Sequence, residues 1–117
     1  MISRRSWTVI VALTLLIAGC SEDREARSEI LAVHAQLTPA TSRSDLAAQV
    51  ARSRLLFVSD AQGPTRWSIG TPLRLDARNW VLWVEFEGDF VRAARIRIYD
   101  SPTMHPDGAP PDIVFSR

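Results

Sequence analysis

The sequence predicts an α+β domain, with two N-terminal helices packed on an antiparallel sheet of three or four strands and an irregular, proline-rich tail. Three observations support this fold class. An apolar stripe with helical spacing runs to Leu37, a helix start signal stands at Ser42, and apolar and polar residues alternate from Trp80 onward at the period of a strand. The expected boundaries are 20–40 for the N-terminus and first helix, 41–100 for the second helix and sheet, and 101–117 for the tail.

The first helix is predicted over residues 21–37. Its apolar side chains recur at spacings of four, three and four residues, which places them on one face: Ala26, Ile30, Val33 and Leu37. Thr38 precedes Pro39, and the residue before a proline is disfavoured in a helix. We therefore expect the first helix to end there.

The second helix is indicated by its start signal. Residues 42–45 read Ser-Arg-Ser-Asp, which resembles a capping box, and Leu46 and Val50 then share one face. The expected end lies near Arg54. This short helix supplies a second apolar face for the sheet.

The strand signals follow the helices. Residues 55–58 form a short apolar run, and residues 66–69 and 73–75 read as one interrupted strand or as two short ones. The clearest strands are residues 80–87 and 94–99. One set of apolar side chains alternates there with a second set that holds the charged residues. These two strands are expected to form a hairpin.

The register of this hairpin follows from the alternation. A two-residue loop at 88–89 would place Arg95 and Arg97 on the same face as Leu82, whereas a three-residue loop at 88–90 keeps them apart, so we predict the longer loop. The apolar face then holds Trp80, Leu82, Val84, Phe86, Ala94, Ile96 and Ile98.

The opposite face of the hairpin is the candidate protein-binding surface. It carries aromatic and arginine side chains, the composition of a binding hot spot: Val81, Trp83, Arg95, Arg97 and Tyr99. Trp83 and Arg95 are expected to form a cation–π contact. The alternative is that these aromatic residues pack beneath the tail or against the first helix.

The two histidines are not predicted to carry chemistry. His34 lies beside the apolar stripe of the first helix, where a histidine is more often partly buried structure than a ligand. His105 lies in the tail near three acidic residues, Asp100, Asp107 and Asp112. One interpretation is that they form a metal site or an acid–base pair with His105. Scattered acids are also common turn formers in such tails. With no nucleophile motif and no phosphate-binding loop, we predict a non-enzymatic protein without metal, cofactor or small-molecule substrate.

Residues 1–20 differ from the rest of the chain. Arg4 and Arg5 precede an uncharged apolar run at 7–18. As a helix this run would reach about 18 Å, short of the ~30 Å hydrocarbon core, which favours a signal peptide over a lasting membrane span. Residues 17–20, Ile-Ala-Gly-Cys, resemble the lipobox of bacterial lipoproteins. The resemblance implies cleavage between Gly19 and Cys20, removal of residues 1–19, and a lipid on the Cys20 thiol.

The charge balance limits the partners. Removing residues 1–19 takes two of the 14 basic residues and none of the 13 acidic ones, so the mature chain has a net charge of −1. This balance gives no reason to expect nucleic acid as a partner. The expected partners are the membrane, through the lipid on Cys20, and another envelope protein.

A weaker resemblance concerns residues 41–99. Residues 41–46 at the second helix and 86–91 at the hairpin are similar to small outer-membrane lipoproteins of the SmpA/OmlA-like, barrel-assembly type, and to the half-domain of β-lactamase-inhibitor-like proteins. Ser21 after the cysteine resembles the outer-membrane sorting pattern, which implies the periplasmic face of the outer membrane. We expect a protein-binding or envelope-assembly module, or alternatively a periplasmic inhibitor or immunity protein against a secreted enzyme.

Overall fold

The computed structural model describes residues 23–73 and 78–116. The predicted signal peptide, its cleavage site at Gly19 and the lipidation site at Cys20 lie outside the described residues, as do residues 74 and 75 of a predicted strand. In the part of the chain that the structure describes, no helix has the length and apolar character needed to cross a membrane.

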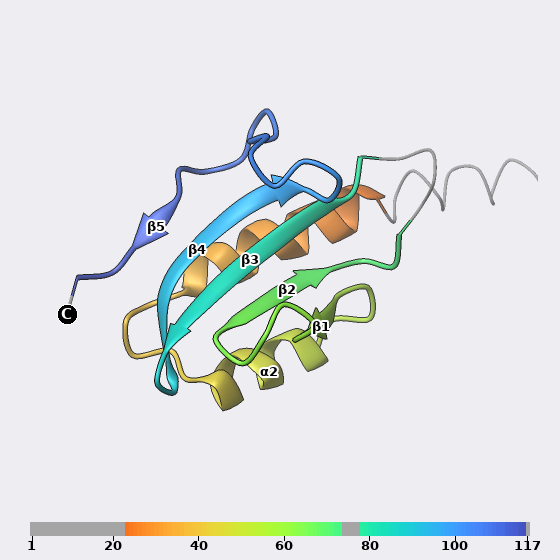
Figure 1. Ribbon diagram of the computed structural model, residues 1–117. Coiled ribbons are helices and arrows are strands. Elements are labelled where there is room, and N and C mark those ends of the chain that lie inside the picture. The colour runs from red at the N-terminus through yellow and green to blue at the C-terminus, as the bar shows by residue number, and fades with distance from the viewer. Residues whose placement is uncertain (1–22, 74–77, 117) are drawn as a thin grey trace, which may run out of the picture.

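The described residues form two helices and one antiparallel sheet of five strands, which confirms the α+β class (Figure 1). The first helix covers residues 23–36, and the remaining elements follow in chain order: α2 (Arg43–Ala51), β1 (Phe57–Ser59), β2 (Arg66–Gly70), β3 (Trp80–Glu87), β4 (Phe90–Ile98) and β5 (Ile113–Val114). Each strand pairs with the next one along the chain, so the sheet order is β1-β2-β3-β4-β5.

The expected sheet of three or four strands was too small, and the tail is not irregular throughout. β5 lies within the tail and pairs with β4, where Ile113 faces Ala94 and Val114 faces Ala93. The tail also donates a hydrogen bond from the Phe115 N–H to the Arg92 carbonyl, at 2.8 Å. Proline density alone did not reveal this strand, because only two residues of the tail join the sheet.

Both helices lie on one face of the sheet, and their apolar stripes meet the sheet there (Figure 1). The predicted stripe of the first helix is confirmed, since all four of its members are buried: Ala26, Ile30, Val33 and Leu37. The sheet contributes buried apolar side chains that include Ile69, Trp80, Leu82, Val84, Phe86 and Ile96. This single layer of apolar side chains between helices and sheet is the core.

The capping box of α2 is confirmed. The Asp45 N–H donates to Ser42 Oγ at 3.1 Å, and the Ser42 N–H donates to Asp45 Oδ2 at 3.3 Å. The helix ends at Ala51, before the expected end near Arg54. The Ser53 hydroxyl accepts hydrogen bonds from the N–H groups of the next turn, and these bonds compete with continuation of the helix.

The β3–β4 pairing confirms the predicted faces but not the predicted loop. Leu82 faces Ile96 and Val84 faces Ala94, as expected, yet Glu87 faces Phe90 across a two-residue turn. A bulge restores the pairing, because Phe86 faces Val91 while Glu85 faces Ala93, which leaves Arg92 as an extra residue. The bulge therefore keeps the arginines of β4 on the face opposite Leu82, which the three-residue loop was expected to do.

The turn itself depends on Gly88. Its φ is +61°, and no non-glycine residue among those described has a positive φ, so Asp89 does not. Glycine with positive φ at the first of two turn positions is the type II′ arrangement, whose twist suits a hairpin. A Cβ at Gly88 would meet nothing within 4 Å, so the requirement comes from the backbone alone.

We predict that Gly88→Val lowers the free energy of unfolding by about 1–2 kcal/mol, because a β-branched residue is strained at this φ. Gly88→Asn is the matched control, since asparagine is found at the positive-φ positions of type I′ and II′ turns and should lower the free energy of unfolding clearly less. Urea unfolding followed by tryptophan fluorescence measures both. Equal stability of the two variants would contradict a backbone requirement at this turn.

Candidate functional site

The face of the sheet that points away from the helices, here called the open face, carries the five residues that the sequence singled out. Trp83 on β3 faces Arg95 on β4, and Val81 faces Arg97. Tyr99 follows β4, and its N–H donates to the Asn79 carbonyl at 2.9 Å. The structure thus brings all five together, although their exposure differs: Val81 is buried, Trp83 is half-buried and Tyr99 is 46% exposed.

Two arginines on the open face share one carboxylate. Glu85 Oε1 lies 3.0 Å from Arg66 Nη2 and 3.7 Å from Arg95 Nη2. Glu85 and Arg95 thus form a contact between β3 and β4, and Arg66 adds a second arginine from β2. The cation–π contact expected between Trp83 and Arg95 is not among those formed by the described residues, where Arg27 lies over Trp80 and Arg43 over Trp67 and Phe86.

The third arginine of the open face is bound by the tail. Arg97 makes a bidentate ion pair with Asp112, with Nη1–Oδ1 and Nη2–Oδ2 distances of 2.8 and 2.6 Å. The paired hydrogen bonds raise the pKa of Arg97 and lower the pKa of Asp112, because each charged group stabilises the other. Arg97 therefore attaches the tail to the sheet, and both of its terminal nitrogens are bound by Asp112.

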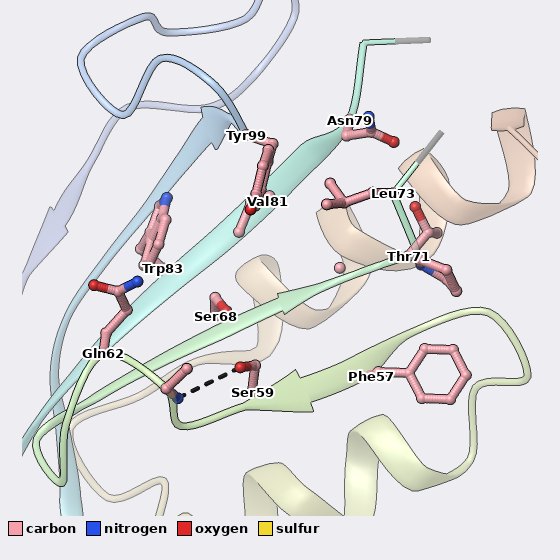
Figure 2. A pocket seen from close by; sticks show the side chains of 13 residues that line it. Phe57, Ser59, Gln62, Ser68, Thr71, Leu73, Asn79, Val81, Trp83 and Tyr99 are labelled. Atoms are coloured by element: carbon pink, nitrogen blue, oxygen red, sulfur yellow. Dashed lines mark hydrogen bonds between the residues drawn. The ribbon is translucent and has the colours of Figure 1, made fainter. Parts of the chain in front are cut away.

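A large groove of about 470 Å³ lies on the open face. Figure 2 shows the side chains that line it. Trp83 and Tyr99 lie along one side of this large groove, and Phe57 and Leu73 lie on the other side, both 59% exposed. The remaining lining residues come from β1, β2, β3 and the segments next to them: Ser59, Ala61, Gln62, Ser68, Gly70, Thr71, Pro72, Asn79 and Val81. The groove is open to solvent and presents mainly apolar side chains.

A second groove adjoins the first. This arginine groove, of about 330 Å³, is lined by Gln62, Arg66, Trp83, Arg95, Tyr99 and Pro102. Gln62, Trp83 and Tyr99 also line the large groove, so these three side chains form the wall between the two. The tail reaches the open face at Pro102 and Asp112 but leaves both grooves uncovered, and no described helix lies on this side (Figure 1).

Trp83 is the centre of this arrangement. It lines both grooves and a smaller one of about 140 Å³ beside β5. Its indole Nε1 is buried and finds no hydrogen-bond acceptor among the described residues. A buried donor without an acceptor lowers the free energy of unfolding. Hydrogen bonding among the described residues therefore does not explain the position of this ring.

Sequence reasoning missed the half of the site that comes from β1 and β2. Arg66, Gln62, Phe57 and Leu73 reach the grooves only because β2 pairs with β3, with Arg66 opposite Glu85 and Ser68 opposite Trp83. The alternation of residues 66–69 was the available signal, since it already separates Arg66 and Ser68 from the buried Ile69.

The histidines are not gathered into a reactive site. His105 Nε2 lies 2.8 Å from the Pro110 carbonyl oxygen, within the tail. Among the described residues, no group of three His, Cys, Asp or Glu side chains could hold a metal ion. The acidic residues that sequence reasoning placed near His105 therefore do not form a ligand set with it.

His34 is more deeply buried than expected, at 5% exposure, and its Nε2 has no hydrogen-bond partner among the described residues. It lies beside the tail residues Gly108, Ala109 and Pro110. Burial lowers the pKa of His34 below 6.5 because it disfavours the charged imidazolium, and the negative charge of Asp112 offsets part of this effect.

This lowered pKa predicts a pH dependence of stability. The unfolded chain binds a proton on His34 more readily than the folded chain, so the free energy of unfolding should fall as the pH is lowered from about 7.5 to about 5.5. His34→Leu should lose most of this dependence, and His105→Gln should retain it. Urea unfolding at several pH values measures the slope. Equal slopes for the wild type and His34→Leu would contradict the assignment.

Comparison of the chain with protein-family models, with curated proteins and with solved structures finds no match. The function must therefore be argued from the chain's own residues. The feature that calls for an explanation is the pair of uncovered grooves that meet at Trp83 on the open face.

Proposed function

We propose that this chain is a bacterial envelope lipoprotein, anchored through lipid on Cys20, that binds another envelope protein with its open face and catalyses no reaction. The observation that carries the proposal is the uncovered aromatic and arginine-lined surface around Trp83. Tryptophan, tyrosine and arginine are the residues most enriched in binding hot spots.

The anchor is supported by the lipobox-like residues 17–20. The described part of the first helix starts at Asp23, three residues after Cys20, so the tether between lipid and helix spans at most about 11 Å. A tether this short keeps the domain at the headgroup surface. Ser21 favours the outer membrane, with the domain on its periplasmic face.

Binding is supported by how the two faces of the sheet are used. The helix-covered face is filled by the core, whereas the open face retains a groove of about 470 Å³ with exposed apolar side chains at its rim. Grooves with apolar walls and a few polar groups are typical binding sites. The polar side chains present do not form a nucleophile, base and orienter set, so binding is a better interpretation than catalysis.

The anchor predicts the behaviour of a Cys20→Ser variant. In cells given a labelled fatty acid, the wild type should be recovered in the membrane fraction with label, and Cys20→Ser should carry no label and leave that fraction. Tyr99→Ser, which leaves the lipobox-like segment intact, is the control. An acylated, membrane-bound Cys20→Ser product would contradict lipidation at this cysteine.

The binding surface predicts where a partner can be crosslinked. A photo-crosslinking phenylalanine analogue at Tyr99, on the open face, should give one discrete adduct in intact cells. The same analogue at Ala48, on the exposed side of α2, should give none. Adducts of equal yield at both positions, or none at Tyr99, would contradict binding through the open face.

Mass spectrometry of the Tyr99 adduct then identifies the class of partner. An integral or lipid-anchored envelope protein supports the proposed function. A single soluble secreted enzyme would instead indicate an inhibitor or immunity protein.

A further inference from the structure

The arginine groove has an unbalanced charge. Two guanidinium groups line it, from Arg66 and Arg95, and none of its lining residues is acidic. Both arginines approach the same oxygen of Glu85, which supplies one negative charge against their two positive charges. The side chains of all three are more than a third exposed, so the excess positive charge is accessible from the groove.

The polar groups of the arginine groove suit a carboxylate. Arginine presents a planar fork of N–H donors that matches the two oxygens of a carboxylate. The Gln62 amide and the Tyr99 hydroxyl can also donate hydrogen bonds into the same groove. An acidic side chain of a partner is therefore the group that this groove fits best.

The large groove suits an apolar side chain, and it begins where the arginine groove ends. Gln62, Trp83 and Tyr99 line both grooves, so the occupants of the two grooves would be neighbours. In an extended chain, side chains two residues apart lie on the same face at a spacing of about 7 Å. A single extended segment can therefore place one side chain in each groove.

The chain's own tail gives one example of an acidic side chain bound by an arginine of the open face. Asp112 binds Arg97 through two hydrogen bonds, and Val114, two residues later, pairs with Ala93 at the edge of β4. The tail therefore places an acidic side chain on this face from an extended backbone, while the Val114 side chain stays 71% exposed. Arg66 and Arg95, which share the single carboxylate of Glu85, offer a neighbouring position for a second acidic side chain.

We propose that the open face binds an extended segment of a partner protein, with an acidic side chain in the arginine groove and an apolar or aromatic side chain two residues away in the large groove. This inference rests on the proposed function and specifies what the open face recognises.

A display library of random heptapeptides, selected on the purified full-length protein, tests the inference. The enriched peptides should carry Asp or Glu two residues from Phe, Trp, Tyr or Leu. Replacing the acid of an enriched peptide by its amide should weaken binding about tenfold, because a charge-assisted pair is lost. The double variant Arg66→Gln/Arg95→Gln should weaken binding by a similar factor, with no further loss for the amide peptide.

The matched control is Arg52→Gln/Arg54→Gln, which removes the same charge at exposed positions just after α2. It should bind the enriched peptides as the wild type does, and circular dichroism checks that both double variants are folded. The inference is overturned by enrichment of peptides without an acid, by no enrichment, or by equal binding to both double variants. Dimerisation that only Arg66→Gln/Arg95→Gln abolishes would also overturn it, by assigning the face to a second copy.

The crosslinking experiment separates this inference from the proposed function. If the Tyr99 adduct persists in Arg66→Gln/Arg95→Gln, the open face binds a partner but the acidic group is not what it recognises. If acidic peptides are selected in vitro but no adduct forms at Tyr99 in cells, the inference about the arginine groove is supported. The proposal of an envelope partner is then contradicted.

Discussion

The extra residue at Arg92 allows a two-residue turn and a same-face apolar pairing to coexist in the β3–β4 hairpin. Since side chains alternate along a strand, without this bulge the residues of β4 beyond Arg92 would exchange faces. Ile96 would then leave the core, and Arg95 would be turned toward the helices. The bulge is also tied to the tail, because the Arg92 carbonyl accepts a hydrogen bond from the Phe115 N–H. Core and open face therefore depend on the same local irregularity.

A second group of contacts fixes the hairpin to the helical layer. The Arg43 N–H donates to the Asp89 carbonyl at 2.9 Å, and its guanidinium donates to the Gly88 carbonyl while lying 4.3 Å from the centroid of Phe86. The turn is thus held by the first residue of α2. These contacts make the start of α2 and the end of the hairpin one unit, which stabilises the sheet from which the open face is built.

The tail contributes to both faces of the domain. Ala109 and Phe115 pack against the core, and His34 lines one hollow with Ala109 and neighbouring tail residues. Asp112 binds Arg97 on the open face. A substitution that detaches the tail would therefore change the surroundings of both His34 and Arg97. The grooves around Trp83 are left uncovered between these attachments, which is why we interpret them as a binding surface.

The sequence by itself determined the α+β class, the apolar stripe from Ala26 to Leu37, the capping box at Ser42 and the faces of β3 and β4. These features depend on local spacing, and local spacing is visible in one chain. Only the tertiary structure decided the bulge at Arg92, the strand within the tail, and the contribution of β1 and β2 to the grooves. Arg66 meets Glu85, and Arg97 meets Asp112, through strand pairing between segments that are distant in sequence, and no local pattern specifies that pairing.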